Sequence, residues 1–222
     1  MCICHCLLAA GCTEEGGAYY IKGQAPSERN LAANAVSPDP DMRAQAITKL
    51  SSNNWGLTEK YLKFYALNLK SDESPVVRSA AARALGRAAD AQYVPNLAAA
   101  LSDPSPAVRR DAAVALDGVP ADAAVGPLQK AALQDSSVDV RIAAIKALRN
   151  YRDAEVSRTL LKCLAEQPFG VSYEAHASLV FLTGQDGQYD VDDWIEILAN
   201  PLPPPKPPAR PWWDWGRTAQ QP

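Results

Sequence analysis

The sequence is poor in the side chains on which many enzymes and nucleic-acid-binding proteins rely. Only two histidines occur, His5 and His176, which excludes most histidine-based catalysis. The net charge of -3 argues against a nucleic-acid partner held by bulk positive charge. The sequence contains no Gly-rich phosphate loop and no Cys-x-x-Cys pair. We therefore expect no cofactor, no metal site in the folded part and no enzymatic activity.

Aromatic residues are also scarce, at 7%, whereas alanine accounts for 39 of the 222 residues. Alanine is the best helix former, and its small side chain lets helices pack closely. Hydrophobic residues make up 47% and charged residues 21%, which is typical of a chain that folds. This length permits one ordinary domain or one short repeat array. The composition favours a helical domain or a helical repeat array.

The first twelve residues, MCICHCLLAAGC, contain no charged side chain, and no Lys or Arg precedes Lys22. They are too few to span a bilayer as a helix, which needs about 20 residues. Leu-Leu-Ala-Ala-Gly-Cys resembles a bacterial lipobox, although the usual positive start is missing. The resemblance implies that residues 1–12 are a signal segment and that Cys12 carries the lipid. We then expect a lipoprotein in the cell envelope, facing the periplasm or the exterior.

Another interpretation of the N-terminus is metal binding. The stretch Cys-x-Cys-His-Cys holds soft ligands for zinc or copper(I), but they crowd into five residues without a second pair downstream. If the signal is cleaved, the mature chain loses this cluster. If it is retained, the protein is a soluble cytosolic scaffold with a metal-binding N-terminus. The ligands in question are Cys2, Cys4, His5 and Cys6.

The middle of the chain is repetitive. Four segments align without gaps, MRAQAITKL, VRSAAARAL, VRRDAAVAL and VRIAAIKAL, each with an Arg seven residues before a Leu. Successive arginines are 35, 31 and 32 residues apart. A degenerate fifth copy, YEAHASLVFL, places Ala175 in the arginine position and Leu182 in the leucine position. The arginines are Arg43, Arg78, Arg109 and Arg141, and the leucines are Leu50, Leu85, Leu116 and Leu148.

Each copy has the apolar spacing of one helix of an αα-hairpin, and short polar stretches predict the turns. The motif VRxxAAxAL resembles HEAT repeats of the short bacterial type, also described as phycobilisome-lyase HEAT-like. The resemblance implies an all-α fold, a right-handed α-solenoid of about five helical hairpins over residues 37–184. Stacked hairpins would share one continuous core. Residues 13–36 are expected to form a flexible linker.

Charged residues recur in register with the repeat. Asp72, Asp103 and Asp135 each precede the repeat arginine by six residues. Recurrence in every repeat favours a structural role, in which the arginine ties neighbouring turns together, over a ladder that binds anionic ligands.

Positions that differ between repeats are better candidates for recognition. HEAT second helices line the concave face, so polar residues one, two and five positions after the arginine are expected to point outward. These residues are the candidate contacts with a protein partner, or merely a solvated face. They are Gln45, Thr48, Arg83, Arg110, Asp111 and Lys146.

The array should close with a loop and a helix over residues 185–200, in which Gly184 ends one helix and Asp190 or Asp192 caps the next. Residues 201–222 form a proline-rich tail that carries Trp212, Trp213 and Trp215. These tryptophans either fold back on the last repeat or contact a membrane or partner.

These features predict a non-enzymatic scaffold that binds protein partners and is held on a membrane by acylated Cys12. The alternative from the enzyme class is a lyase or the accessory subunit of an enzyme, which the name of the resembling family suggests. His176 and Cys163 are the only candidate reactive groups in the mature chain, and neither lies in a catalytic motif.

Overall fold

The structure is a computed structural model that describes residues 27–166 and 168–200. All regular structure in these two ranges is helical. The α-helices are α1 (Glu28–Asn34), α2 (Pro40–Ser51), α3 (Glu59–Ser71), α4 (Pro75–Ala88), α5 (Val94–Ala100), α6 (Pro106–Asp117), α7 (Val125–Gln134), α8 (Val138–Leu148), α9 (Ala154–Leu164), α10 (Phe169–Thr183) and α11 (Val191–Ala199). Short 3₁₀ segments, Asn54–Leu57, Ala91–Tyr93 and Asp122–Ala124, precede α3, α5 and α7.

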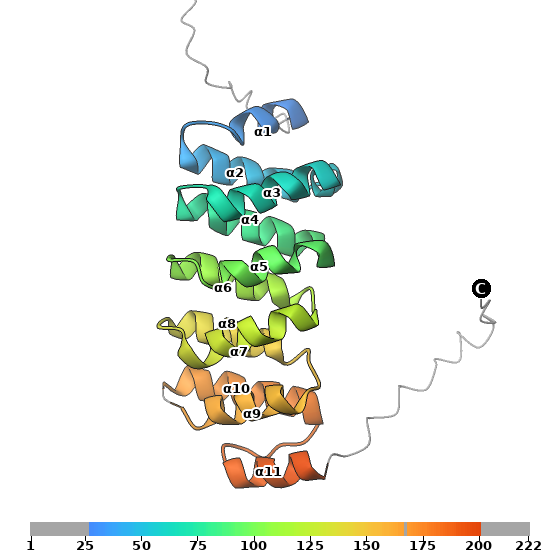
Figure 1. Ribbon diagram of the computed structural model, residues 1–222, viewed down its shortest axis with the longest axis vertical. Coiled ribbons are helices and arrows are strands. Elements are labelled where there is room, and N and C mark those ends of the chain that lie inside the picture. Colours follow the sequence, from blue (N-terminus) through green and yellow to red (C-terminus); the bar gives the residue numbers. More distant parts are fainter. Residues whose placement is uncertain (1–26, 167, 201–222) are drawn as a thin grey trace, which may run out of the picture.

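Consecutive helices pair into hairpins that stack along one axis in chain order, from α1 at one end to α11 at the other (Figure 1). The pairs are α1/α2, α3/α4, α5/α6, α7/α8 and α9/α10, and we call the later member of each pair its second helix. This arrangement confirms the prediction of an all-α solenoid of about five hairpins. No helix in the described ranges is both long and apolar enough to cross a membrane.

The first hairpin corrects the expected boundary of the flexible linker. Residues 28–34 form α1 instead of an extended segment, and the side chains of Leu31 and Ala35 are buried against the array. Ser27 caps this helix by accepting a hydrogen bond from the backbone N–H of Asn30. Tyr61 of α3 donates a hydrogen bond of 2.7 Å to Glu28. The array therefore starts with α1, ahead of residue 37.

Three of the second helices begin at a proline. Proline occupies the first helical position of α2, α4 and α6, where its missing N–H leaves no hydrogen bond unmade.

The closing segment has the helix ends that the sequence predicts. Of the two candidate caps of α11, Asp190 is the one used, and it accepts hydrogen bonds from the N–H groups of Asp192 and Asp193. Gly184 ends α10 with φ of 71°, a left-handed conformation that suits glycine.

The core runs through all five hairpins. The four repeat leucines, Leu50, Leu85, Leu116 and Leu148, are at most 1% exposed. Burying such a side chain contributes about 1.5–3 kcal/mol to folding. Because no hairpin can cover its own apolar face, each relies on its neighbours for this burial.

The fifth copy follows another register than the one expected. Val171 and Leu179 are fully buried, whereas Leu182 is only partly buried. Leu179 therefore takes the leucine position, and Ser172, seven residues before it, takes the arginine position. Ser172 lies 31 residues after Arg141, which matches the other spacings. The expected assignment of Ala175 and Leu182 was wrong because α10 is apolar nearly all round.

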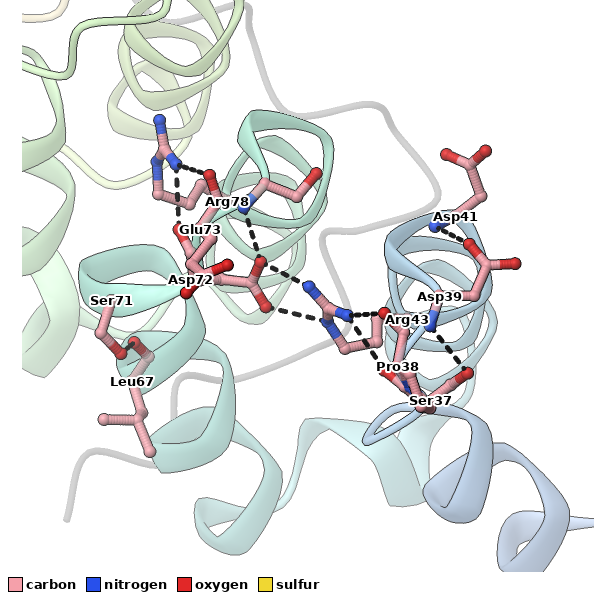
Figure 2. A network of polar contacts seen from close by, with 11 residues as sticks. Ser37, Pro38, Asp39, Asp41, Arg43, Leu67, Ser71, Asp72, Glu73 and Arg78 are labelled. Carbon is pink, nitrogen blue, oxygen red and sulfur yellow. Dashed lines mark hydrogen bonds and ion pairs between the residues drawn. The ribbon is translucent and has the colours of Figure 1, made fainter. Parts of the chain in front are cut away.

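The repeat arginines tie each hairpin to the next, and Figure 2 shows the first of these contacts, between Arg43 and Asp72. Arg43 donates hydrogen bonds of 3.0 and 2.8 Å to both carboxylate oxygens of Asp72 in the following hairpin. Its remaining nitrogen donates to the backbone carbonyls of Ser37 and Pro38, at 2.9 Å each. Arg78 makes the same contacts with Asp103, and Arg109 with Asp135. This repeated arrangement, called the arginine ladder below, bears out the structural interpretation.

The ladder has a fourth contact, which the analysis of the repeats in the sequence did not predict. Arg141 contacts Glu166 at 2.5 Å, and Glu166 precedes Ser172 by six residues, as each ladder aspartate precedes its arginine. A glutamate thus takes the place of aspartate in the last hairpin. Because Ser172 replaces the arginine there, the ladder ends at α10.

The hairpins lie closer together on the side of the second helices. Successive second helices contact one another extensively, whereas successive first helices touch only slightly. Hollows of about 360 and 560 Å³ open between α3 and α5 and between α5 and α7. A stack that is tighter on one side is concave there, so the second helices line the concave face.

Candidate functional site

The concave surface of α2, α4, α6, α8 and α10, called the second-helix face below, is the candidate binding site. Of the three predicted positions, only position five after the repeat arginine points consistently outward. It carries Thr48, which is partly exposed, and Arg83, Val114 and Lys146, which are exposed. These side chains lie on the second helices of four successive hairpins and so form a row across the array.

Positions one and two do not behave as expected. At position two, Gln45 is exposed, but Ala80 and Ala143 are buried. At position one, Arg110 is exposed, whereas Ser79 is buried. The two buried alanines were a signal, available in the sequence, that position two faces a neighbouring helix.

Asp111 is the prediction that the structure contradicts most directly. It was expected to point outward, but only 4% of the residue is exposed. One carboxylate oxygen accepts hydrogen bonds of 3.2 and 2.9 Å from Arg110, and the other accepts from Ser79 and Arg83 of α4. A buried carboxylate is stable only with such partners. Asp111 therefore organises the face and does not present itself to a partner.

The two arginines that surround Asp111 remain accessible. The side chain of Arg83 is 41% exposed and that of Arg110 is 49% exposed. Two guanidinium groups share one carboxylate, so this group of residues keeps a net positive charge. The carboxylate holds both groups at fixed positions, which lowers the entropy that they lose on binding a partner.

A hollow adjoins Arg83 on the same face. It has a volume of about 300 Å³, lies between α2 and α4, and includes Gln45, Thr48, Val76 and Arg83 in its lining. Val76 and Val114 are exposed apolar side chains at 50% and 56%. Apolar contacts flanked by fixed cations are typical of a surface that binds another protein.

Aromatic side chains gather at the C-terminal end of the array, where the sequence analysis predicted no site. Phe169, Tyr173 and Tyr189, called the aromatic patch below, are 63%, 54% and 46% exposed. The ring of Phe169 lies 6.1 Å from Tyr173 and 5.8 Å from Tyr189. His176 stacks on Tyr189 at 4.8 Å. The patch thus combines residues of α10 with a residue of the loop before α11, which are distant in the sequence and are brought together by the fold.

His176 belongs to this end of the array as a structural contact. Its Nε2 lies 2.8 Å from a carboxylate oxygen of Asp186, and this hydrogen bond lowers the pKa of Asp186. The ring also meets Trp194 edge-on at 5.9 Å. The Trp194 indole is fully buried and donates to the carbonyl oxygen of Gln188 at 2.9 Å. His176 therefore orients the loop that covers the last hairpin.

The other candidate reactive group in the described residues is the thiol of Cys163. Cys163 is fully buried, and burial raises the pKa of its thiol to about 12. A nucleophilic cysteine requires the thiolate, which this environment suppresses. In residues 27–166 and 168–200, no three His, Cys, Asp or Glu side chains converge as metal ligands do.

Comparison with known proteins decides the family. The HEAT-repeat family matches residues 62–128 and 95–180, which together cover more than half of the chain. The chain belongs to the HEAT-repeat family. The hairpins described above are therefore HEAT repeats, and the arginine ladder joins one HEAT repeat to the next.

Solved structures share this fold of stacked helical hairpins. The complex of CpcE and CpcF of phycocyanin lyase from Nostoc sp. PCC7120 is 21% identical, with a TM-score of 0.64 over 84% of this chain and 73% of that one. A designed armadillo repeat protein in complex with the peptide (KR)4 is 20% identical, with a TM-score of 0.53 over 76% and 87%. At these identities the likeness concerns the fold. No curated protein matches the chain.

Several predicted site residues lie outside the described part of the HEAT protein. They are the proposed lipid-bearing Cys12, the alternative ligands Cys2, Cys4, His5 and Cys6, and the tail residues Trp212, Trp213 and Trp215. Among the candidates within the described residues, the fold brings Arg83, Arg110 and Asp111 together. Lys146 lies two HEAT repeats away from Arg83 on α8, exposed on the same face.

Proposed function

We propose that this HEAT protein is a non-enzymatic scaffold that binds a protein partner through its second-helix face. The row of outward positions on the second helices of four successive hairpins supports this proposal most directly. The row contains Val114 and Arg83, and Asp111 holds the guanidinium groups of Arg83 and of neighbouring Arg110 in place. Such a surface suits an extended segment that crosses several repeats, because each repeat supplies its own contact. The designed armadillo protein above was solved with a peptide, (KR)4, bound to a similar fold.

We further propose that acylated Cys12 holds the scaffold on a bacterial membrane, within the cell envelope. The support comes from the sequence Leu-Leu-Ala-Ala-Gly-Cys and from the uncharged stretch before it. Two or three acyl chains would provide stable anchoring, because each buried CH₂ contributes about 0.8 kcal/mol. The segment between Cys12 and α1 would then space the HEAT array from the bilayer.

The partner-binding proposal can be tested with two matched double variants. Val114→Glu with Lys146→Glu places negative charge on the second-helix face. Leu67→Glu with Lys162→Glu makes the same kinds of change at exposed positions of α3 and α9, on the convex side. Chemical cross-linking in native membranes should yield the same partner adduct from the wild type and the convex-side variant. The face variant should lose it. Equal loss in both variants, or in neither, would contradict the proposal.

The anchor has a separate test, namely mass spectrometry of the N-terminal peptide from native membranes. The proposal expects a peptide that begins at acylated Cys12, and a Cys12→Ser variant that moves to the soluble fraction. An intact, unmodified Met1 in the soluble fraction would overturn the anchor. That outcome would favour the cytosolic alternative with a retained Cys/His cluster, but would leave the partner-binding face untouched.

A further inference from the structure

The last HEAT repeat exposes an aromatic surface in an unusually acidic part of the chain. Residues 184–200 contain no Lys or Arg, but five Asp and Glu residues. The aromatic patch, Phe169, Tyr173 and Tyr189, borders this region and leaves three large rings accessible. Exposed aromatic clusters of this kind mark interaction sites.

A hollow of about 320 Å³ lies in the same region, between the loop after α10 and α11. Its lining includes the carboxylates of Asp186, Asp193 and Glu196. The side-chain Nε2 of Gln185, which also lines it, is buried and has no hydrogen-bond partner. The hollow is therefore lined by acidic side chains and by a residue whose amide N–H has no acceptor within the described residues.

The hollow and the aromatic patch are physically connected. Asp186 lines the hollow and pairs with His176 at 2.8 Å, and His176 in turn stacks on Tyr189 at 4.8 Å. A segment that occupies the hollow can therefore continue directly onto the aromatic rings. The hollow also includes Asn200, the residue at which the described chain reaches the tail.

The tail has the complementary chemistry. Residues 201–222 carry three cations, Lys206, Arg210 and Arg217, against the single carboxylate side chain of Asp214. Proline-rich backbone offers carbonyl oxygens that no internal hydrogen bond uses, and such segments dock on aromatic surfaces. Three tryptophans follow the proline run and would otherwise expose large apolar areas.

The tail is also long enough. At about 3.1 Å per residue in an extended proline-rich form, Lys206 can lie up to about 19 Å from Asn200, and Trp212 up to about 37 Å. The proline run therefore begins beside the hollow. The tryptophans can reach the other end of α10, which is 15 residues long and spans about 22 Å.

We propose that residues 201–222 dock on this end of the array. The proline run and Lys206 occupy the acidic hollow, and Trp212, Trp213 and Trp215 cover the aromatic patch. The tail then acts as the C-terminal cap of the solenoid. This proposal does not depend on the proposed partner, because the row formed by Arg83, Val114 and Lys146 remains free.

Hydroxyl-radical footprinting of the full chain, read by mass spectrometry, tests the docking. The wild type is compared with the variant Trp212→Ala, Trp213→Ala, Trp215→Ala. Labelling of Phe169, Tyr173 and Tyr189 should be about twofold slower in the wild type, because the indoles cover roughly half of the exposed ring area. Leu67 on α3 is the internal control and should be labelled equally in both chains.

A charge-reversed variant, Lys206→Glu with Arg210→Glu, tests the electrostatic part of the docking. It should increase labelling of the patch at low salt, whereas added salt should increase labelling of the wild type. Equal labelling of the patch in wild type and tryptophan variant would overturn the proposal. If protection of the patch grows with protein concentration, the proposal is overturned, and the patch contacts a second copy of the chain. If protection is seen only in membranes, the proposal is also overturned, and a lipid surface or an external partner covers the patch.

Discussion

At the scale of single residues, the second-helix face depends on Asp111. The pattern of the repeat identified the position but not its environment, because it treated residues one, two and five after the arginine alike. In the fold, position two of α6 points toward the neighbouring second helix α4. A carboxylate there must find partners, and Ser79, Arg83 and Arg110 provide them. Arg83, Arg110 and Asp111, which were expected to bind a partner separately, therefore act as one group.

Replacing Asp111 by alanine should destabilise the array by about 1–2 kcal/mol. The loss leaves Ser79 and two arginines without their shared acceptor, although the arginines are partly exposed and regain water. Chemical denaturation at neutral pH measures the change. Asp139→Ala on α8 is the control, since Asp139 is exposed, and should change the free energy of unfolding by no more than about 0.5 kcal/mol. Equal effects of the two substitutions would show that the Asp111 contacts do not stabilise the fold.

At the scale of helices, the close approach of neighbouring second helices requires a small residue at one point. A Cβ atom added to Gly86 of α4 would lie 2.7 Å from the Cβ atom of Ala115 in α6. Both atoms are held by helical backbones, so neither can move cheaply. The repeat motif ends at Leu85 and contains no hint of this contact, which depends on the distance between two helices.

Gly86→Ala should therefore destabilise the protein by about 1–3 kcal/mol, although alanine is the better helix former. The matched control is Gly126→Ala in α7, where an added Cβ would meet nothing within 4 Å. That substitution should stabilise the helix by about 0.5–1 kcal/mol. Thermal denaturation of both variants measures the difference. A stabilising effect at Gly86 would mean that α4 and α6 are farther apart than the structure shows.

The arginine ladder links one HEAT repeat to the next and should make stability depend on pH. Burial alone would raise the pKa of Asp72, Asp103 and Asp135. Hydrogen bonds from the arginines and the backbone, with the arginine charges, outweigh it and lower each pKa below 3.8. Unfolded aspartate titrates near about 3.9, so the ladder contributes fully above that pH. Its contribution is lost as the pH falls from about 4 through the lowered folded values.

Asp103→Asn should lower the free energy of unfolding at pH 7 by about 2 kcal/mol, because it removes one charge-assisted pair. The variant should also lose less stability than the wild type between pH 4 and lower pH. Urea denaturation at a series of pH values measures both effects. Parallel pH profiles for the two proteins would show that Asp103 does not contribute to acid denaturation.

At the scale of the whole molecule, the solenoid must close both of its ends. The short helix α1 covers the first end through Leu31 and Ala35, and α11 covers the other with the buried indole of Trp194. The sequence indicated the second closure, because glycine and aspartate frame α11, but missed the first. The helix α1 has only seven residues, and Leu31 is the only one of them that is buried. So short a segment has no recognisable apolar periodicity, and its role becomes visible only from the helices that it covers.

Trp194→Ala should destabilise the C-terminal end by about 3–5 kcal/mol, since it removes a large, fully buried side chain. In a solenoid, each repeat contacts only its neighbours, so the effect should stay local. Hydrogen exchange should increase in α10 and α11 and remain unchanged in α4 and α6. A uniform increase along the chain would instead indicate that the array unfolds as a single cooperative unit.

The sequence by itself determined the class of the fold, the second helices and the turns between repeats. These features follow from local rules, namely the spacing of apolar residues along a helix, proline at helix starts and charged residues at a fixed distance from one another. It also identified the repeat arginines as structural, because a contact between identical units must recur with the repeat.

Tertiary structure alone decided the rest. The burial of Asp111, the register of α10, the aromatic patch and the closure by α1 all depend on which surfaces neighbouring helices cover. Phe169 and Tyr189 are twenty residues apart in the chain, and their rings meet because the loop between α10 and α11 returns toward the start of α10. Periodicity shows which residues share one face of a helix. The distance and angle between helices decide whether that face is buried or open to a partner.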